Sequence, residues 1–242
     1  MKVNLLPRLQ FQILSLLIIL LLATLDGCTL RQNNDLVFQS STLTSLKEGD
    51  FEGPISVSEI KHHGNLGLGT FNGIDGEMII NNGVVYNAKY NGSLILADDS
   101  SRSPFVVVTD FVPDYNVEIT GKTCEELEDD IKKGFSDLNH IRALRITGDF
   151  EYVKYRSVKK QAKPYPKLEE VVKDENIMTQ SPSSGTAVGF WFPDDFQQVN
   201  VRGFHLHYIN KNISRGGHLL DCKVKSAVVY IDNKNSLFIS IN

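Results

Sequence analysis

Three histidines lie close together near the end of the sequence, in a pattern that suits a metal ion. His205 and His207 stand two residues apart in the β-prone run 203–208, and His218 follows after a polar stretch. Alternate residues of a strand point to the same face, so His205 and His207 are expected to share one face. The polar residues 210–215 predict a hairpin, which returns His218 to their side from the next strand.

Three imidazoles without a fourth strong ligand suit a catalytic Zn²⁺ site, which keeps one coordination position open for water or substrate. A structural zinc site would normally be closed by thiolates. Cys222 lies four residues beyond His218, and we leave it out of the ligand set because most free cysteines pack as small hydrophobic residues. An HxH pair alone can also decorate a strand without binding metal, and it is the third histidine that favours the metal site.

Residues 1–27 have the pattern of a signal peptide and are excluded from the fold. Basic residues precede an apolar run from Phe11 to Leu25, which is short for a bilayer span of about twenty residues. Residues 25–28 resemble a bacterial lipobox with Cys28 as the lipid-bearing first residue, and the alternatives are ordinary cleavage nearby or an uncleaved anchor. We therefore expect an exported protein, either a membrane-anchored lipoprotein or a periplasmic or secreted protein, that meets a membrane only through this segment.

The overall composition is that of a globular protein. The chain has 242 residues, of which 22% are charged, and a formal net charge of −4. It is long enough to bury one substantial core or two small ones, and its acidic balance gives no indication of a nucleic-acid partner. Cys124 and Cys222 can form a disulfide in an oxidising compartment, but the sequence does not place them within bonding distance, so their pairing stays open.

Turn and capping residues divide the chain into short elements. Capping boxes predict a short helix after Ser56 and a longer helix from Thr123 to about Phe135. Hairpins at Asp75-Gly76 and Asn82-Gly83 separate predicted strands at 77–80, 84–89, 93–97 and 104–111. After a proline-rich turn, a short helix is expected at 168–173, and strands follow.

These elements predict an α/β fold of the α+β type, with mixed and antiparallel β-sheets in two packed β-rich halves and a few short helices. Residues 28–50 are expected to form a linker and the first strand, and 51–160 the N-terminal β-rich half. Residues 161–242 are expected to form the C-terminal β-rich half, which carries the metal site and is truncated at its C-terminus.

Several segments together resemble the alpha-acetolactate decarboxylase family, from about Leu66 to Leu237. The matching motifs, in order, are 67–73, 75–78, 155–158, 163–166, 189–191, 203–207 and 216–221. The resemblance implies a carboxy-lyase that converts 2-acetolactate to (R)-acetoin and CO₂ in acetoin and butanediol biosynthesis. It implies Zn²⁺ bound by His205, His207 and His218, an enediolate stabilised by that metal, and a homodimer.

The resemblance also implies three catalytic residues. Arg156 is expected to bind the substrate carboxylate, because a guanidinium offers a fork of donors and keeps its charge. Glu77 matches the family's active-site glutamate, which implies a role in proton transfer or substrate orientation, and Thr70 matches a position whose hydroxyl reaches the substrate region. Without the resemblance, these residues also fit a surface arginine, an exposed hairpin glutamate and a turn threonine.

One departure from the family and two alternative functions stay open. Family members usually continue into a C-terminal segment with a further active-site glutamate, whereas this sequence stops at Asn242, so we expect impaired activity. The first alternative is a non-catalytic, zinc-binding envelope lipoprotein derived from the family. The second, less favoured, is a cupin-like metal oxygenase, whose motif places a glutamate where this chain has Asn210 and Lys211.

Overall fold

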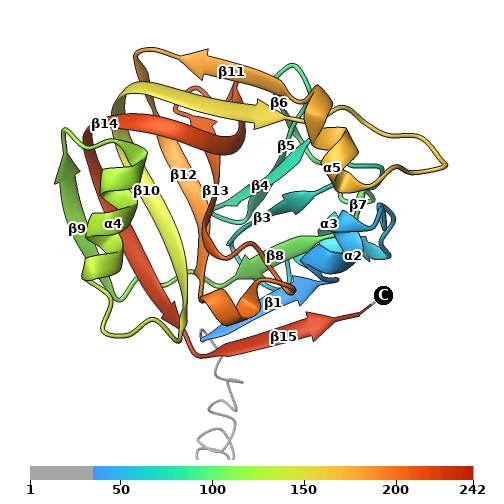
Figure 1. Cartoon of the computed structure of the whole chain (residues 1–242), viewed down its shortest axis with the longest axis horizontal. Helices are drawn as coiled ribbons and strands as arrows, with labels where there is room; N and C mark the ends of the chain where they lie inside the picture. Colours follow the sequence, from blue (N-terminus) through green and yellow to red (C-terminus); the bar gives the residue numbers. More distant parts are fainter. Residues whose placement is uncertain (1–34, 242) are drawn as a thin grey trace, which may run out of the picture. The chain divides into compact units, whose positions relative to one another are not determined.

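The computed structural model describes residues 35–241, and this part of the chain consists mainly of β-strands. Among these residues no helix is long and apolar enough to cross a membrane. The strands form two main sheets, which we name sheet 1 and sheet 2 (Figure 1). The mixed and antiparallel sheets with few short helices that the sequence predicts are confirmed. The predicted signal peptide, residues 1–27, and Cys28 lie outside the described residues.

Sheet 1 has the strand order β15-β1-β8-β3-β4-β5-β6. The pair β1–β15 is parallel, and the other neighbouring pairs are antiparallel. The turn between β4 and β5 has the Asn82-Gly83 hairpin signal, with φ of 51° and 76°, as a two-residue hairpin requires. The strand bounds are β1 (Leu36–Ser40), β3 (Leu66–Thr70), β4 (Glu77–Asn81), β5 (Val84–Ala88), β6 (Leu94–Leu96), β8 (Val106–Thr109) and β15 (Ser236–Ser240).

Sheet 2 has the order β11-β10-β12-β13-β14-β9, and β10 also pairs with β14. The additional pairing closes a ring of β10, β12, β13 and β14, so this sheet is strongly curved. Register shifts in the β10–β14 pair, for example between Asp149 and Phe150, increase the bend. The bounds are β9 (Tyr115–Thr120), β10 (Ile141–Ser157), β11 (Asn176–Gln180), β12 (Ser183–Phe192), β13 (Gly203–Asn210) and β14 (Gly216–Lys234).

The two sheets do not follow the order of the chain. Strands β9 and β10 precede residue 160 but belong to sheet 2, and β15 near the C-terminus belongs to sheet 1. The predicted N-terminal half, 51–160, therefore contributes strands to both sheets, and so does the predicted C-terminal half, 161–242. A small further sheet joins β2 (Ile55–Ser56) to β7 (Arg102–Ser103).

Two of the helices, α3 and α4, begin at the capping residues that the sequence predicts. Ser56 accepts a hydrogen bond from the Glu59 backbone at the start of α3, and Thr123 and Glu126 form a reciprocal capping box at the start of α4. Figure 1 shows α4 beside sheet 2, whereas α2 and α5 lie together at the other end of the molecule. The helices are α2 (Leu43–Lys47), α3 (Val57–Ile60), α4 (Cys124–Lys133), α5 (Leu168–Val171), and the 3-10 turns η1 (Val172–Asp174) and η2 (Asp194–Phe196).

Hydrophobic packing fixes the two sheets against each other. One cluster of buried side chains joins the inner faces of the sheets and includes Leu68 and Ile79 from sheet 1 and Val188 and Phe190 from sheet 2. A second cluster lies between sheet 2 and α4, where a disulfide joins Cys124 to Cys222. β4 is buried on both faces along most of its length and packs against β12, β13 and β14 of sheet 2.

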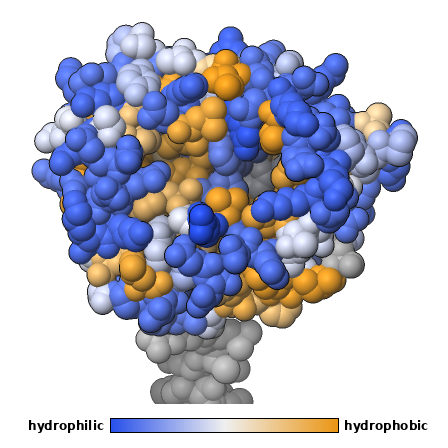
Figure 2. Space-filling view, in the orientation of Figure 1, coloured by the Kyte–Doolittle hydropathy of each residue, from blue (hydrophilic) through white to orange (hydrophobic). Residues whose placement is uncertain are grey.

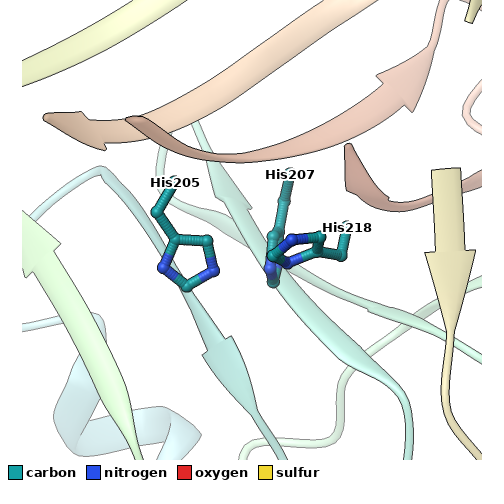
Figure 3. A group of neighbouring side chains, drawn as sticks. All are labelled: His205, His207 and His218. Atoms are coloured by element: carbon teal, nitrogen blue, oxygen red, sulfur yellow. The ribbon is translucent and has the colours of Figure 1, made fainter. Parts of the chain in front are cut away.

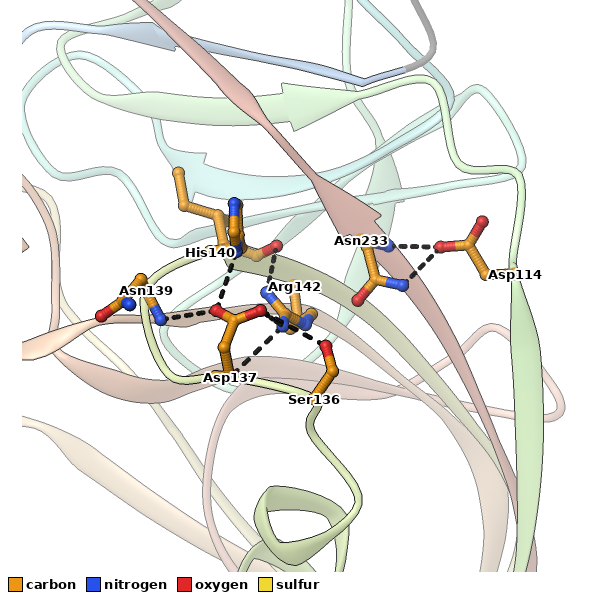
Figure 4. A network of polar contacts seen from close by, with 8 residues as sticks. Asp114, Ser136, Asp137, Asn139, His140, Arg142 and Asn233 are labelled. Carbon is orange, nitrogen blue, oxygen red and sulfur yellow. Dashed lines mark hydrogen bonds and ion pairs between the residues drawn. The ribbon is translucent and has the colours of Figure 1, made fainter.

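A polar network anchors the start of β10 (Figure 4). Arg142 is only 1% exposed, donates to the backbone carbonyl of Asp137 at 3.2 Å and lies 5.0 Å from the Phe135 ring centroid. Hydrogen bonds from the Asn139 backbone and the His140 ring lower the pKa of Asp137 to about 2. The loop that follows α4 is therefore fastened to the strand that carries part of the candidate site.

Hydrophilic side chains cover most of the surface seen in Figure 2. Hydrophobic residues gather along the lower edge of this view, over β15. Phe238 on β15 is 55% exposed, and Ile241, which follows this strand, is 71% exposed. An edge strand with apolar side chains in water is a surface on which another chain could pack.

Candidate metal centre

The three predicted histidines converge on one side of sheet 2 (Figure 3). His207 and His218 are directly opposite each other in the antiparallel pair β13–β14, and His205 lies on the same face as His207. The ring centroids are 5.0 to 5.3 Å apart, and one ring nitrogen from each histidine lies within 4.8 Å of the others. This convergence is the one that the strand alternation and the polar hairpin predict. Cys222 is in a disulfide, which leaves it out of the ligand set.

The protonation of these rings suits metal binding. Burial lowers the pKa of His207 to about 4 and holds those of His205 and His218 well below the usual value, so all three are neutral at pH 7. Nδ1 of His207 donates to the carbonyl of Met78 at 2.7 Å, which leaves Nε2 with a free lone pair. That Nε2 is buried without a hydrogen-bond partner in the described part of the chain. A divalent cation would satisfy it.

Glu77 approaches the histidines from sheet 1. It is the first residue of β4 and is 8% exposed, and its Oε2 lies 3.6 Å from Nε2 of His207. Burial raises the pKa of this carboxyl to about 7, although the charge of Arg156 acts in the opposite direction. The preceding Gly76 has φ +87°, and a Cβ there would lie 2.4 Å from the Ala88 carbonyl oxygen. Only glycine therefore allows the turn that places Glu77.

Thr70 lines the same cavity but uses its proton locally. It ends β3 directly opposite Glu77, and its Oγ1 donates to the carbonyl of Gly76 at 2.7 Å. The hydroxyl thus fastens the turn that precedes Glu77, while its oxygen can still accept a hydrogen bond. The predicted contact of Thr70 with substrate stays a prediction.

Arg156 comes from a third strand of sheet 2. On β10 it lies directly opposite His218, so His207, His218 and Arg156 form one row across β13, β14 and β10. Its side chain is 22% exposed, and its Nη1 forms an ion pair with Oε2 of Glu175. Nε is buried and has no hydrogen-bond partner among residues 35–241. Arg156 is thus a partly buried cation beside the histidines and not a surface arginine.

A cavity joins these groups, and its remaining wall is largely apolar. The sequence reasoning missed this wall and also Glu175. The spacing of Leu43 and Leu46, and of Leu168 and Val172, indicates apolar helix faces, but no pattern marks Glu175. The residues that line the cavity are Leu43, Leu46, Gly69, Thr70, Ile74, Glu77, Phe105, Arg156, Val158, Leu168, Val172, Val201, His205, His207 and His218.

A cavity with three neutral histidines, a carboxyl group of raised pKa and a guanidinium is typical of a metal-dependent enzyme that acts on a small anionic molecule. The sequence profile of the alpha-acetolactate decarboxylase family matches residues 37–242, and this chain belongs to that family. It is an enzyme of this kind, a carboxy-lyase that acts on a small molecule. The resemblance found in the motifs is therefore confirmed over most of the chain.

Individual relatives agree with the family match. The chain is 39% identical to the alpha-acetolactate decarboxylase of Methylococcus capsulatus over 197 residues. This alignment covers 81% of this chain and 76% of the relative. It is 37% identical to the enzyme of Bacillus licheniformis, covering 84% and 81%. The crystal structure of alpha-acetolactate decarboxylase from Bacillus subtilis strain 168 has a TM-score of 0.84 at 35% identity, covering 85% and 88%.

Proposed function

We propose that this chain converts 2-acetolactate to (R)-acetoin and CO₂ with one Zn²⁺ bound by His205, His207 and His218. One observation carries the proposal: the histidine cluster has a guanidinium on one side and a carboxyl group on the other. Arg156 is opposite His218 on the neighbouring strand, and Glu77 lies 3.6 Å from His207. These are the groups needed to hold an anionic substrate and to move a proton beside a metal.

In the first step, the protein must hold the substrate in place while CO₂ leaves. Arg156 would bind the carboxylate through two parallel hydrogen bonds. The bond to CO₂ breaks, its electron pair moves towards the ketone oxygen, and an enediolate results. Zn²⁺ held by the histidines would supply the Lewis acidity that stabilises this negative charge. The apolar side chains around the cavity lower the local dielectric constant, which strengthens the electrostatic interactions inside it.

The second step asks for a proton on carbon, and Glu77 is placed to give it. In the metal-free site, burial raises the pKa of Glu77 to about 7, so this carboxyl can hold a proton much closer to neutral pH than an exposed glutamate can, as a general acid must. Glu77 reaches the site from sheet 1, whereas Arg156 and the histidines reach it from sheet 2. A proton delivered from that one side would produce a single enantiomer.

An assay of the purified protein with racemic 2-acetolactate tests the proposal. We expect acetoin well above the spontaneous background, mostly as the (R) enantiomer on chiral chromatography, and loss of that activity after chelation with recovery on adding Zn²⁺. A metal-loaded protein that forms acetoin no faster than buffer would overturn the proposal and favour the non-catalytic zinc-binding lipoprotein. The cupin-like alternative has no support, because Asn210 and Lys211 lie at the hairpin and supply no carboxylate to the cluster.

Location and assembly are proposals that rest on separate observations. We propose export from the pattern of residues 1–28, with lipid attached at Cys28 as the favoured form. We propose a homodimer because the resemblance implies it, and the exposed Phe238 on edge strand β15 and Ile241 just after it offer an apolar surface. Cell fractionation of the full chain tests export, and analytical ultracentrifugation of the protein without residues 1–27 tests the homodimer, both independently of activity.

A further inference from the structure

A second carboxylate, Glu175, lies next to the candidate site, and nothing in the sequence marks it. Its Oε2 forms an ion pair with Nη1 of Arg156. The two side chains are largely buried, at 19% and 22% exposed. Removal of either side chain would leave the other charge uncompensated in a region of low dielectric constant, which costs more free energy than it would on the surface.

The fold brings Glu175 to this place through a short connecting segment. Glu175 follows η1 and precedes β11, whose Ile177 pairs with Arg156. Figure 1 shows this segment leading from α5 into β11. Leu168 and Val172, at its start, line the cavity, and Asn176 donates to the Tyr90 carbonyl at 2.8 Å. The segment is therefore a fixed wall of the cavity, and Glu175 projects from it to Arg156.

The ion pair with Glu175 involves one side of the guanidinium, at Nη1, and leaves the Nε–Nη2 edge for another partner. A carboxylate can bind a guanidinium either through both Nη atoms or side-on, through Nε and Nη2. Glu175 is hydrogen-bonded to Nη1, so a carboxylate bound through both Nη atoms would have to share Nη1 with Glu175, whereas the side-on arrangement leaves Nη1 to Glu175. Nε is buried and unpartnered within the described part of the molecule, so a donor of the side-on edge is available.

We propose that Glu175 is a positioning residue that holds Arg156 by Nη1 so that its Nε–Nη2 edge receives the substrate carboxylate beside the histidine cluster. This inference rests on the proposed function. In binding the substrate, Arg156 then keeps its hydrogen bond to Glu175 and gains two more. Without Glu175 the Arg156 side chain could rotate about its aliphatic bonds and turn the guanidinium. The substrate carboxylate would then lose its fixed position relative to the histidine cluster.

Binding measurements separate this inference from catalysis. The probe is 2-hydroxy-2-methylpropanoate, which carries the carboxylate and hydroxyl of acetolactate but no ketone, titrated calorimetrically into zinc-loaded protein. In Glu175→Ala we expect its affinity to fall about tenfold or more, the usual effect of losing a hydrogen bond to a charged group. Glu175→Gln should bind within about threefold of wild type, because the amide oxygen accepts the same hydrogen bond from Nη1.

The kinetic and control measurements complete the test. KM for acetolactate should rise in Glu175→Ala, whereas inhibition by acetoin, which has no carboxylate, should not change. Glu169→Ala removes an exposed glutamate from α5, outside the cavity, and should match wild type in every measurement. Zinc content and melting temperature, compared with those of Glu169→Ala, show whether Glu175→Ala is folded.

Three results would overturn the inference. Unchanged probe affinity in Glu175→Ala would show that Arg156 needs no positioning. Tighter binding would show that Glu175 competes with the substrate for the guanidinium. Equal damage in the alanine and glutamine variants, with loss of zinc, would indicate a purely structural role. If the wild type binds the probe but forms no acetoin, the proposed function fails while the role of Glu175 in carboxylate binding can still be decided.

Discussion

The raised pKa of Glu77 predicts that this carboxyl group destabilises the metal-free fold at neutral pH. Burial raises the pKa from its ordinary value of 4.5 to about 7, so the folded state binds the proton more tightly than the unfolded state does. The free energy of unfolding therefore falls as pH rises from about 4.5 to about 7, and it remains lower above that range. A shift of this size corresponds to about 3 kcal/mol, since each pKa unit is about 1.4 kcal/mol.

Glu77→Gln removes the titration while keeping the shape of the protonated side chain. Relative to wild type, we expect the metal-free variant to gain about 3 kcal/mol at pH 8 and less than about 1 kcal/mol at pH 5, where the wild-type carboxyl is largely protonated when folded. The buried histidines also make stability depend on pH, but they do so in both proteins, so their effect cancels from the difference. The assay is urea unfolding of chelator-treated protein at the two pH values.

The test compares the stability advantage of Glu77→Gln over wild type, in free energy of unfolding, at pH 8 with the same advantage at pH 5. Any pH-independent cost of placing an amide in the cavity shifts both values equally and does not affect it. Glu118→Gln, on the exposed face of β9, serves as the control and should change stability by no more than about 0.5 kcal/mol at either pH. A Glu77→Gln protein whose advantage over wild type is the same at both pH values would refute the assignment of a raised pKa.

Four further outcomes are expected. His218→Ala should lose most of the roughly one zinc per chain on elemental analysis, and full occupancy would contradict the ligand set. Arg156→Lys keeps the charge but loses the fork, so acetoin formation should fall at least about tenfold with circular dichroism unchanged; an unchanged rate would remove Arg156 from the mechanism. Replacing Cys124 and Cys222 by serine opens a bond that spans 98 residues and should lower the free energy of unfolding by about 4 kcal/mol, as reductant should in the wild type. Mass spectrometry of the native protein should find a lipid-modified Cys28 at its N-terminus, whereas another start would favour ordinary cleavage.

Local patterns in the sequence predict the part of the site that depends on local geometry. His205 and His207 share a face because strand side chains alternate, and His218 joins them because residues 210–215 form the expected hairpin. The helix starts at Ser56 and Thr123 follow from hydrogen bonds within four residues. Each of these features is decided by groups that are neighbours along the chain.

Such local patterns do not predict which strands pair when the strands are far apart in the sequence. Nothing in the residues near Arg156 shows that β10 pairs with β14 on one side and with β11 on the other, and that pairing places Glu175 next to it. The parallel pairing of β1 with β15 joins residues about two hundred positions apart. The disulfide, which the sequence left open, also depends on how α4 packs on sheet 2. These contacts follow from the packing of both sheets, which local propensity does not determine.

The candidate metal centre depends on both sheets, although its three imidazoles all belong to sheet 2. The carbonyl of Met78 on β4 accepts the Nδ1 proton of His207, and that hydrogen bond decides which nitrogen faces the cluster. Glu77, the residue before Met78, supplies the carboxyl group beside the same ring. A substitution that moves β4 relative to β13 would therefore change the proposed metal binding and the proposed proton delivery by Glu77 together, without altering any of the three histidines. Conversely, a bound metal ion stabilises the contact between the sheets, because only the packed arrangement presents His207 with its Nε2 lone pair free.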